Sequence, residues 1–207
     1  MRAASNRGAA REWPLPHDTV PEDTAIARDT RPKITVRPAS AREFPTVWKL
    51  LMGLAVYERR RHHVTATPAR LRRHGAGRRP YFKALICRRG AEPVGVAVYL
   101  MTYSTFAGRP TLYIEDIFVL PRARGQGAGL ALMRALARIA LRTGCGRMAW
   151  SVLRWNTPAI RFYRRLGAQT VSAWVSMGFR TEEISRLAAS DGRRSRRVGR
   201  ARSSARG

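Results

Sequence analysis

Apolar residues recur along residues 32–189 with two periods, and these periods predict both strands and helices. Alternating or continuous apolar runs indicate strands at 33–37, 81–87, 94–103, 111–120, 147–153 and 171–179. Helical spacing predicts helices at 44–58, 130–142 and 157–166, with a short helix after Pro68. Short turns join the second, third and fourth strands, which implies an antiparallel meander. The fold class is therefore α/β or α+β, with a mixed, mainly antiparallel sheet flanked by helices.

Local signals support the ends of these elements. Ser40 and Glu43 have the spacing of a capping box before the first helix, and Gly144 and Gly167 follow the two later helices. The sequence predicts one folded domain at 32–189.

The two ends of the chain differ from this domain in composition. Residues 1–31 contain three prolines without any apolar period, so they are interpreted as a disordered leader. Residues 190–207 consist largely of Arg, Ser, Gly and Ala, which predicts a disordered basic tail. The formal net charge is +27, but the arginines are spread over the whole chain and only three lysines occur. Binding of nucleic acid through the tail is an alternative to a charged but otherwise ordinary surface.

Membrane, secretory and metal-binding classes find little support in the sequence. No apolar run approaches the roughly 18 residues that a membrane span needs, and no signal peptide is evident. Cys87 and Cys145 are far apart and lack the spacing of metal ligands or of a disulfide framework. We expect a cytoplasmic protein without a metal.

A glycine-rich segment lies between the fourth strand and the second long helix. Gly125, Gly127 and Gly129 alternate with other residues, so successive backbone amides can face one concavity. The positive end of the following helix adds to this, and Arg122 and Arg124 can add charge. The segment suits a pyrophosphate, although a tight strand–helix connection would also require glycine.

Two carboxylates interrupt the apolar run of the fourth strand. Adjacent strand residues point to opposite faces, so Glu115 would share a face with Tyr113 and Ile117, and Asp116 with Ile114, unless a bulge intervenes. Charges within such a run are either functional or paired with neighbouring arginines.

Two motifs together resemble those of GNAT acetyltransferases. The first is Arg124-x-x-Gly127-x-Gly129 after 117–121, and the second is the segment 156–168. Segments 37–39, 54–58, 102–103, 112–119 and 155–160 are similar, more narrowly, to spermidine/spermine (diamine) acetyltransferases. The resemblance covers about residues 33–180. It implies a GNAT fold, acetyl-CoA as co-substrate, a small primary amine as acceptor, direct attack in a ternary complex and a homodimer.

The resemblance also implies roles for individual residues. Tyr163 would protonate the departing thiolate, Glu115 would act as base through water, and Asp116 would bind the amine. Asn156 and Tyr163 are seven residues apart, so both can face one ligand. The residues implied in binding CoA are Ile117, Phe118, Val119, Arg124, Gly125, Gln126, Gly127, Ala128, Gly129, Asn156 and Tyr163. Those implied in binding the acceptor are Tyr57, Glu58, Glu115, Asp116 and Trp155.

The acceptor half departs from the diamine subfamily. Its members carry an acidic stretch after the segment that matches 54–58, whereas this chain has Arg59-Arg60-Arg61-His62-His63. Ser104 stands where an acidic residue is usual. The arginines suit an amino-acid-like acceptor better than a dication. Acetylation of a protein or peptide, and a GNAT-like fold that binds polyanions without catalysis, remain alternatives.

Overall fold

The computed structural model describes residues 32–171 and 176–189, in two compact units divided after Ser151. The predicted leader at 1–31 and tail at 190–207 lie outside the described residues.

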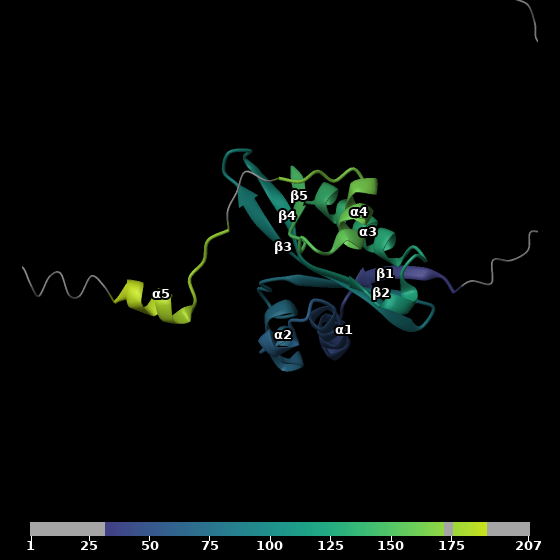
Figure 1. Ribbon diagram of the computed structural model, residues 1–207, viewed down its shortest axis with the longest axis horizontal. Helices are drawn as coiled ribbons and strands as arrows, with labels where there is room; N and C mark the ends of the chain where they lie inside the picture. Colours follow the sequence, from purple (N-terminus) through teal and green to yellow (C-terminus); the bar gives the residue numbers. More distant parts are fainter. Residues whose placement is uncertain (1–31, 172–175, 190–207) are drawn as a thin grey trace, which may run out of the picture. The chain divides into compact units, whose positions relative to one another are not determined.

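The first unit is built on a five-stranded sheet (Figure 1). The strands lie side by side in chain order: β1 (Ile34–Pro38), β2 (Lys83–Arg89), β3 (Glu92–Ser104), β4 (Arg109–Val119) and β5 (Arg147–Trp150). The first four pair antiparallel, and β4 pairs parallel with β5. The predicted meander is confirmed.

Helices cover both faces of this sheet (Figure 1). They are α1 (Phe44–Tyr57) and α2 (Pro68–Gly75) on one side and α3 (Ala128–Arg142) on the other, with 3₁₀ turns at Ala41–Glu43, Arg61–His63 and Pro121–Ala123. Val47 and Leu50 of α1 pack on a cluster that includes Val96, Val98 and Phe118. Burial of these apolar side chains is what holds α1 on the sheet.

Gly53 allows α1 to approach β4 closely. A Cβ atom at this position would lie 2.8 Å from the Phe118 ring, so any larger residue would push the helix away from the strand. The end of α1 is thereby brought to the strand that carries the two carboxylates.

A polar network fixes the start of α1. The Glu43 carboxylate accepts hydrogen bonds from both terminal nitrogens of Arg37 at 2.7 Å, from Arg88 at 3.0 Å and from the Ser40 amide at 3.0 Å. The arginines and the amide hold the pKa of Glu43 well below its usual range. The predicted capping box is confirmed, although the first turn is 3₁₀ and the α-helix begins at Phe44.

The second unit contains α4 (Thr157–Arg165) and α5 (Thr181–Ala188). Helix α4 matches its prediction, whereas α5 was not predicted. The strand expected at 171–179 is not present at its described positions, Val171 and 176–179, which have no regular structure. Residues 172–175 lie outside the described part. No helix in the described residues has both the length and the apolar content of a membrane span.

Candidate active site

The glycine loop between β4 and α3 has the open backbone that the sequence predicts. Gly125 and Gly127 have φ of +73° and +88°, values that residues with a side chain rarely adopt. No atom lies within 4 Å of where a Cβ would stand at either position. Helix α3 begins two residues earlier than expected, so Gly127 is its N-cap and Ala128 and Gly129 lie in its first turn.

The backbone amides of this loop are available to a ligand. Among the described residues, no acceptor is found for the amides of Gly125, Gln126 and Gly127. The first turn of α3 adds amides that have no partner within the helix and carries the positive end of the helix dipole. Open space and unpaired donors together suit a phosphate group.

The polar side chains of the loop are held by the protein itself. Arg124 donates from Nε to the Val119 carbonyl at 3.1 Å, and its guanidinium lies over the Tyr57 ring. Gln126 donates to the Arg122 carbonyl at 2.9 Å and accepts from Arg89. These contacts fix the shape of the loop.

A β-bulge at Glu115 changes the faces that simple alternation predicts. Val98 pairs with Asp116, but the next residue, Tyr99, pairs with Ile114, so Glu115 is an extra residue in β4. Directly opposed residues point to the same face. Asp116 therefore lies on the α1 face with Val98, whereas Ile114 lies on the opposite face with Tyr99. The sequence predicts a shared face for Asp116 and Ile114 only in a strand without a bulge, and here the bulge places them on opposite faces.

The bulge leaves the two carboxylates in different environments. Glu115 is exposed, whereas Asp116 is half-buried. Burial first, and then the charges of Glu115 and Glu58, raise the pKa of Asp116 to about 6. Glu58, which follows α1 directly, is thus close enough to Asp116 to act on its charge. The structure brings together three of the predicted acceptor-binding residues.

The second half of β4 is exposed along one edge. Pairing with β5 covers only Thr111 to Ile114 and ends at Trp150. From Glu115 to Val119, β4 has no strand neighbour on that side in the described part of the chain. The backbone amides that the resemblance implies, near Ile117 and Val119, belong to this stretch, while the Phe118 side chain is buried in the core.

Three predicted site residues lie in the second unit. Asn156 is the N-cap of α4, and its side-chain oxygen accepts from the Ala159 amide at 3.4 Å. Tyr163 is buried, and burial raises the pKa of its phenol to about 12. Trp155 is 52% exposed. The capping role of Asn156 is additional to the predicted contact with CoA.

The backbone conformation of one arginine near the site was not predicted from the sequence. Arg59, directly after Glu58, has φ of +59°, in the left-handed region where glycine is the usual choice. A glycine there would have indicated the end of the helix, but an arginine carries no such signal.

Other features lie apart from these residues. A surface hollow of about 620 Å³ is lined by Ala41, Ala69, Arg70, Arg72, Arg73, Ala76 and Gly77, none of which is a predicted site residue. Within the described ranges, no group of three or more His, Cys, Asp or Glu residues could hold a metal.

Comparison with known proteins identifies the family to which this chain is similar. The profile of the acetyltransferase (GNAT) family matches residues 44–168. Thialysine N-epsilon-acetyltransferase of Mus musculus is 34% identical over 164 residues, which cover 74% of this chain and 96% of the mouse protein. Spermidine/spermine N(1)-acetyltransferase-like protein 1 of Homo sapiens is 33% identical over 159 residues, or 72% of this chain and 23% of the human protein. Among solved structures, an integron cassette protein from the V. cholerae mobile metagenome has a TM-score of 0.63 at 23% identity, covering 75% of this chain and 97% of its own.

Proposed function

Because this chain belongs to the GNAT acetyltransferase family, we propose that it transfers the acetyl group of acetyl-CoA to a primary amine of a small molecule. The amine nitrogen forms a bond to the acetyl carbon while the carbon–sulfur bond breaks. The amine loses a proton and the departing thiolate gains one. The residues of this chain have to hold both substrates and move these two protons.

The glycine loop is the observation that supports acetyl-CoA binding most directly. Gly125 and Gly127 leave space where side chains would stand, and their amides have no acceptor among the described residues. The pyrophosphate of CoA offers the negative oxygens that such donors bind. In the proposal, amides from Gly125 to Gly129 hold the pyrophosphate, and the free edge of β4 near Ile117 and Val119 receives the pantetheine arm.

The carboxylates of β4 and α1 supply the acceptor side. Asp116 and Glu58 form a negatively charged site that favours an ammonium group, because opposite charges attract most where water is excluded. We assign amine binding to Asp116 and Glu58, and removal of the amine proton through water to Glu115, which is exposed. The resemblance assigns Tyr57 and Trp155 to binding of the acceptor.

Tyr163 supplies the proton for the thiolate. With its pKa raised to about 12, the phenol keeps its proton throughout the physiological pH range. A thiol has a pKa of about 8.5, so transfer from the phenol becomes favourable only as the site stabilises the phenolate. Asn156, the cap of the same helix, is assigned a contact with CoA.

The names of the relatives indicate which classes of amine this chain could accept. The mouse relative is named for thialysine and the human one for spermidine and spermine. We therefore place the acceptor among diamines, polyamines and amino acids with a terminal amine. We also propose that the protein is a cytoplasmic homodimer and that it works without a metal. These points rest on the resemblance alone. Sedimentation of the purified protein tests whether it is a dimer.

A mass-spectrometric screen tests the activity. Purified full-length protein is incubated with acetyl-CoA and a panel of amines, amino acids and peptides. The expected result is a mass increase of one acetyl group on small primary amines. Acetylation of peptides alone, or no binding of any CoA species in calorimetry, would overturn the proposal.

A further inference from the structure

The C-terminal end of α1 lies where the two proposed substrate sites meet. The Tyr57 ring contacts the guanidinium of Arg124, which precedes the glycine loop, at 4.5 Å from the ring centroid. The next residue, Glu58, acts electrostatically on Asp116 of β4. Whatever follows Glu58 in the chain therefore starts beside the acceptor carboxylates.

Arg59 follows, in a conformation that does not suit it. The Arg59 amide donates to Val56 at 3.0 Å and the Arg60 amide to Ala55 at 2.8 Å, a pattern that ends a helix with one left-handed residue. Glycine adopts that conformation freely, whereas a residue with a Cβ does so at a cost. Among the described residues, Arg59 is the one position other than glycine with positive φ. Strain of this kind, kept beside a site, points to a use for the side chain.

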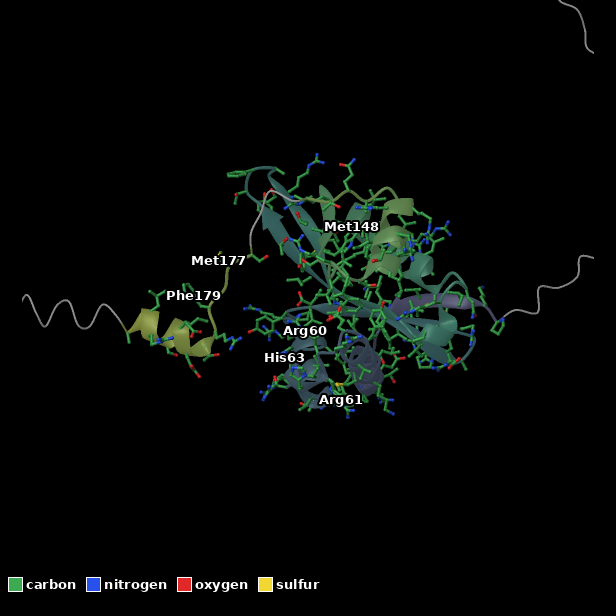
Figure 2. The ribbon with its side chains drawn as sticks, viewed as in Figure 1. Arg60, Arg61, His63, Met148, Met177 and Phe179 are labelled. Carbon is green, nitrogen blue, oxygen red and sulfur yellow. The ribbon has the colours of Figure 1, made fainter. Side chains whose placement is uncertain are left out.

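Within the described part of the chain, the charges in this segment have no ion-pair partner. Arg59, Arg60 and Arg61 are exposed, and in the described ranges no carboxylate lies within ion-pair distance of any of them (Figure 2 labels Arg60 and Arg61). An arginine-rich surface would explain why arginines here are unpaired. It would not explain why an arginine, and not a glycine, stands at a position with a left-handed backbone conformation.

Negative and positive groups thus follow each other directly in the chain. Glu58 and Asp116 attract an ammonium group, and Arg59 to Arg61 attract an anion. A dication would gain from the first set and be repelled by the second. A ligand that carries both signs of charge would gain from both, provided that its charged groups are separated by a few bonds.

We propose that Arg59, assisted by Arg60 and Arg61, binds the carboxylate of an amino-acid acceptor whose terminal side-chain ammonium lies at Asp116 and Glu58. This rests on the proposed acetyltransferase function. A guanidinium binds a carboxylate through two parallel hydrogen bonds, so it selects for this group as well as attracting it. Arg59 is then a specificity-determining residue that distinguishes an amino acid from a diamine.

Two acceptors that differ only in the carboxylate test this. L-Ornithine and 1,4-diaminobutane have the same chain and terminal amine, and L-lysine with 1,5-diaminopentane forms a second pair. For the full-length wild-type protein with acetyl-CoA, kcat/KM is expected to be higher for the amino acid of each pair. Arg59→Gly should lower kcat/KM for the amino acids by about 10-fold or more, the scale of a lost charged hydrogen bond. It should change the diamine values by no more than about 2-fold by the same reasoning, because diamines have no group for Arg59 to bind.

A measurement of Tm and two further variants, Arg138→Ala and Arg59→Lys, complete the test. Arg59→Gly places glycine at a position with a left-handed backbone conformation, so its Tm should equal or exceed that of the wild type. A loss of activity then cannot come from unfolding. Arg138→Ala removes one exposed positive charge from α3 and should leave the amino-acid preference unchanged. Arg59→Lys should keep part of that preference, since the charge remains and the paired hydrogen bonds are lost.

The outcomes separate this inference from the proposed function. The inference about Arg59 is overturned if the wild type prefers diamines, or if Arg59→Gly keeps the same preference for amino acids. Acetylation of any of these amines would still support the proposed acetyltransferase activity. If none of the four amines is acetylated and calorimetry shows no heat with acetyl-CoA, both are overturned.

Discussion

The guanidinium carbon of Arg124 lies 4.5 Å from the centroid of the Tyr57 ring and 5.8 Å from that of Phe118. Its Nε donates to the Val119 carbonyl at 3.1 Å. One side chain thus joins the start of the glycine loop to the end of α1 and to β4. It holds the proposed acetyl-CoA loop in a fixed relation to the proposed acceptor site.

Replacing Arg124 by lysine tests this positioning role. Arg124→Lys keeps the charge but loses the planar stacking group and the Nε donor. We expect the KM for acetyl-CoA to rise about 3- to 10-fold, since a contact of this kind contributes about 0.5–2 kcal/mol. Arg122→Lys is the control, because Arg122 is paired with Glu92 at the surface. Equal KM values in the two variants would contradict the role of Arg124.

A side chain at Gly127 should interfere with acetyl-CoA binding. Gly127→Ala places a methyl group in the space assigned to the pyrophosphate, and we expect at least a 10-fold weaker Kd by calorimetry, which corresponds to about 1.4 kcal/mol. Gly108→Ala is a matched control, because Gly108 also has positive φ, at +60°, and equally open surroundings.

Both alanine variants should lose about 1–2 kcal/mol of unfolding free energy from the left-handed backbone. Only Gly127→Ala should lose affinity for acetyl-CoA. If the two variants bind acetyl-CoA equally well, the loop is a tight connection and not a ligand site.

Much of this architecture follows from local sequence signals. The apolar periods predict α1, α3, α4 and the five strands, since each element buries one face. The glycines at 125 and 127 predict the open loop, because the backbone there requires them.

Other features depend on distant partners and carry no local signal. The bulge at Glu115 arises from the register between β3 and β4, so the residues around it do not reveal it. It places Asp116 on the face of the sheet that α1 covers, where burial and the charges of Glu115 and Glu58 raise its pKa. The strand expected at 171–179 shows the limit of an apolar run as a signal, because its described positions, Val171 and 176–179, have no regular structure. Helix α5 was missed because its apolar positions are few.

The Glu43 network should stabilise the fold in a pH-dependent way. Glu43→Gln removes the charge that Arg37 and Arg88 share, and we expect a loss of about 1–3 kcal/mol of unfolding free energy at pH 7. The folded-state pKa of Glu43 is depressed, so its contribution is present above about pH 4.5 and is lost as the pH falls below that value. Urea unfolding from pH 3 to 7 measures this.

The control for Glu43 is Glu183→Gln. Glu183 pairs with Arg186 on the exposed surface of α5 and should contribute no more than about 0.5 kcal/mol. A Glu43 effect as small as that of Glu183, or one that persists unchanged at pH 3, would contradict the network's role.

Tyr163→Phe should remove the proton donor and leave the fold intact. Loss of a general acid usually lowers turnover by about 10²- to 10⁴-fold, and we expect a kcat reduction in this range. With its pKa near 12, the wild-type phenol should cause no decline in activity up to about pH 10. Tyr103→Phe is the control, since Tyr103 is 65% exposed at the end of β3. Full activity in Tyr163→Phe would remove this residue from the mechanism.

Asp116→Asn should raise the stability of the fold and lower the activity of the enzyme. In the wild type, the contribution of Asp116 to stability falls as the pH rises, whereas its contribution to activity increases. The folded-state pKa of Asp116 is raised from 3.8 to about 6, so its contribution to stability is full below pH 3.8 and is lost as the pH rises through 6. Compared with the wild type, the neutral variant should therefore have an unfolding free energy that is about 1–3 kcal/mol higher at pH 8 and nearly equal at pH 4.

The same substitution should reduce activity, because the ammonium group needs the charged carboxylate. Wild-type kcat/KM should therefore rise with pH through about 6. Asp116→Asn should lower kcat/KM by about 10²-fold and should not show this rise. Exposed Glu115, compared as Glu115→Gln, should affect kcat with little change in stability. If Asp116→Asn is no more stable than the wild type at pH 8, the buried charge is compensated within the fold; if it retains full kcat/KM, the amine does not bind at Asp116.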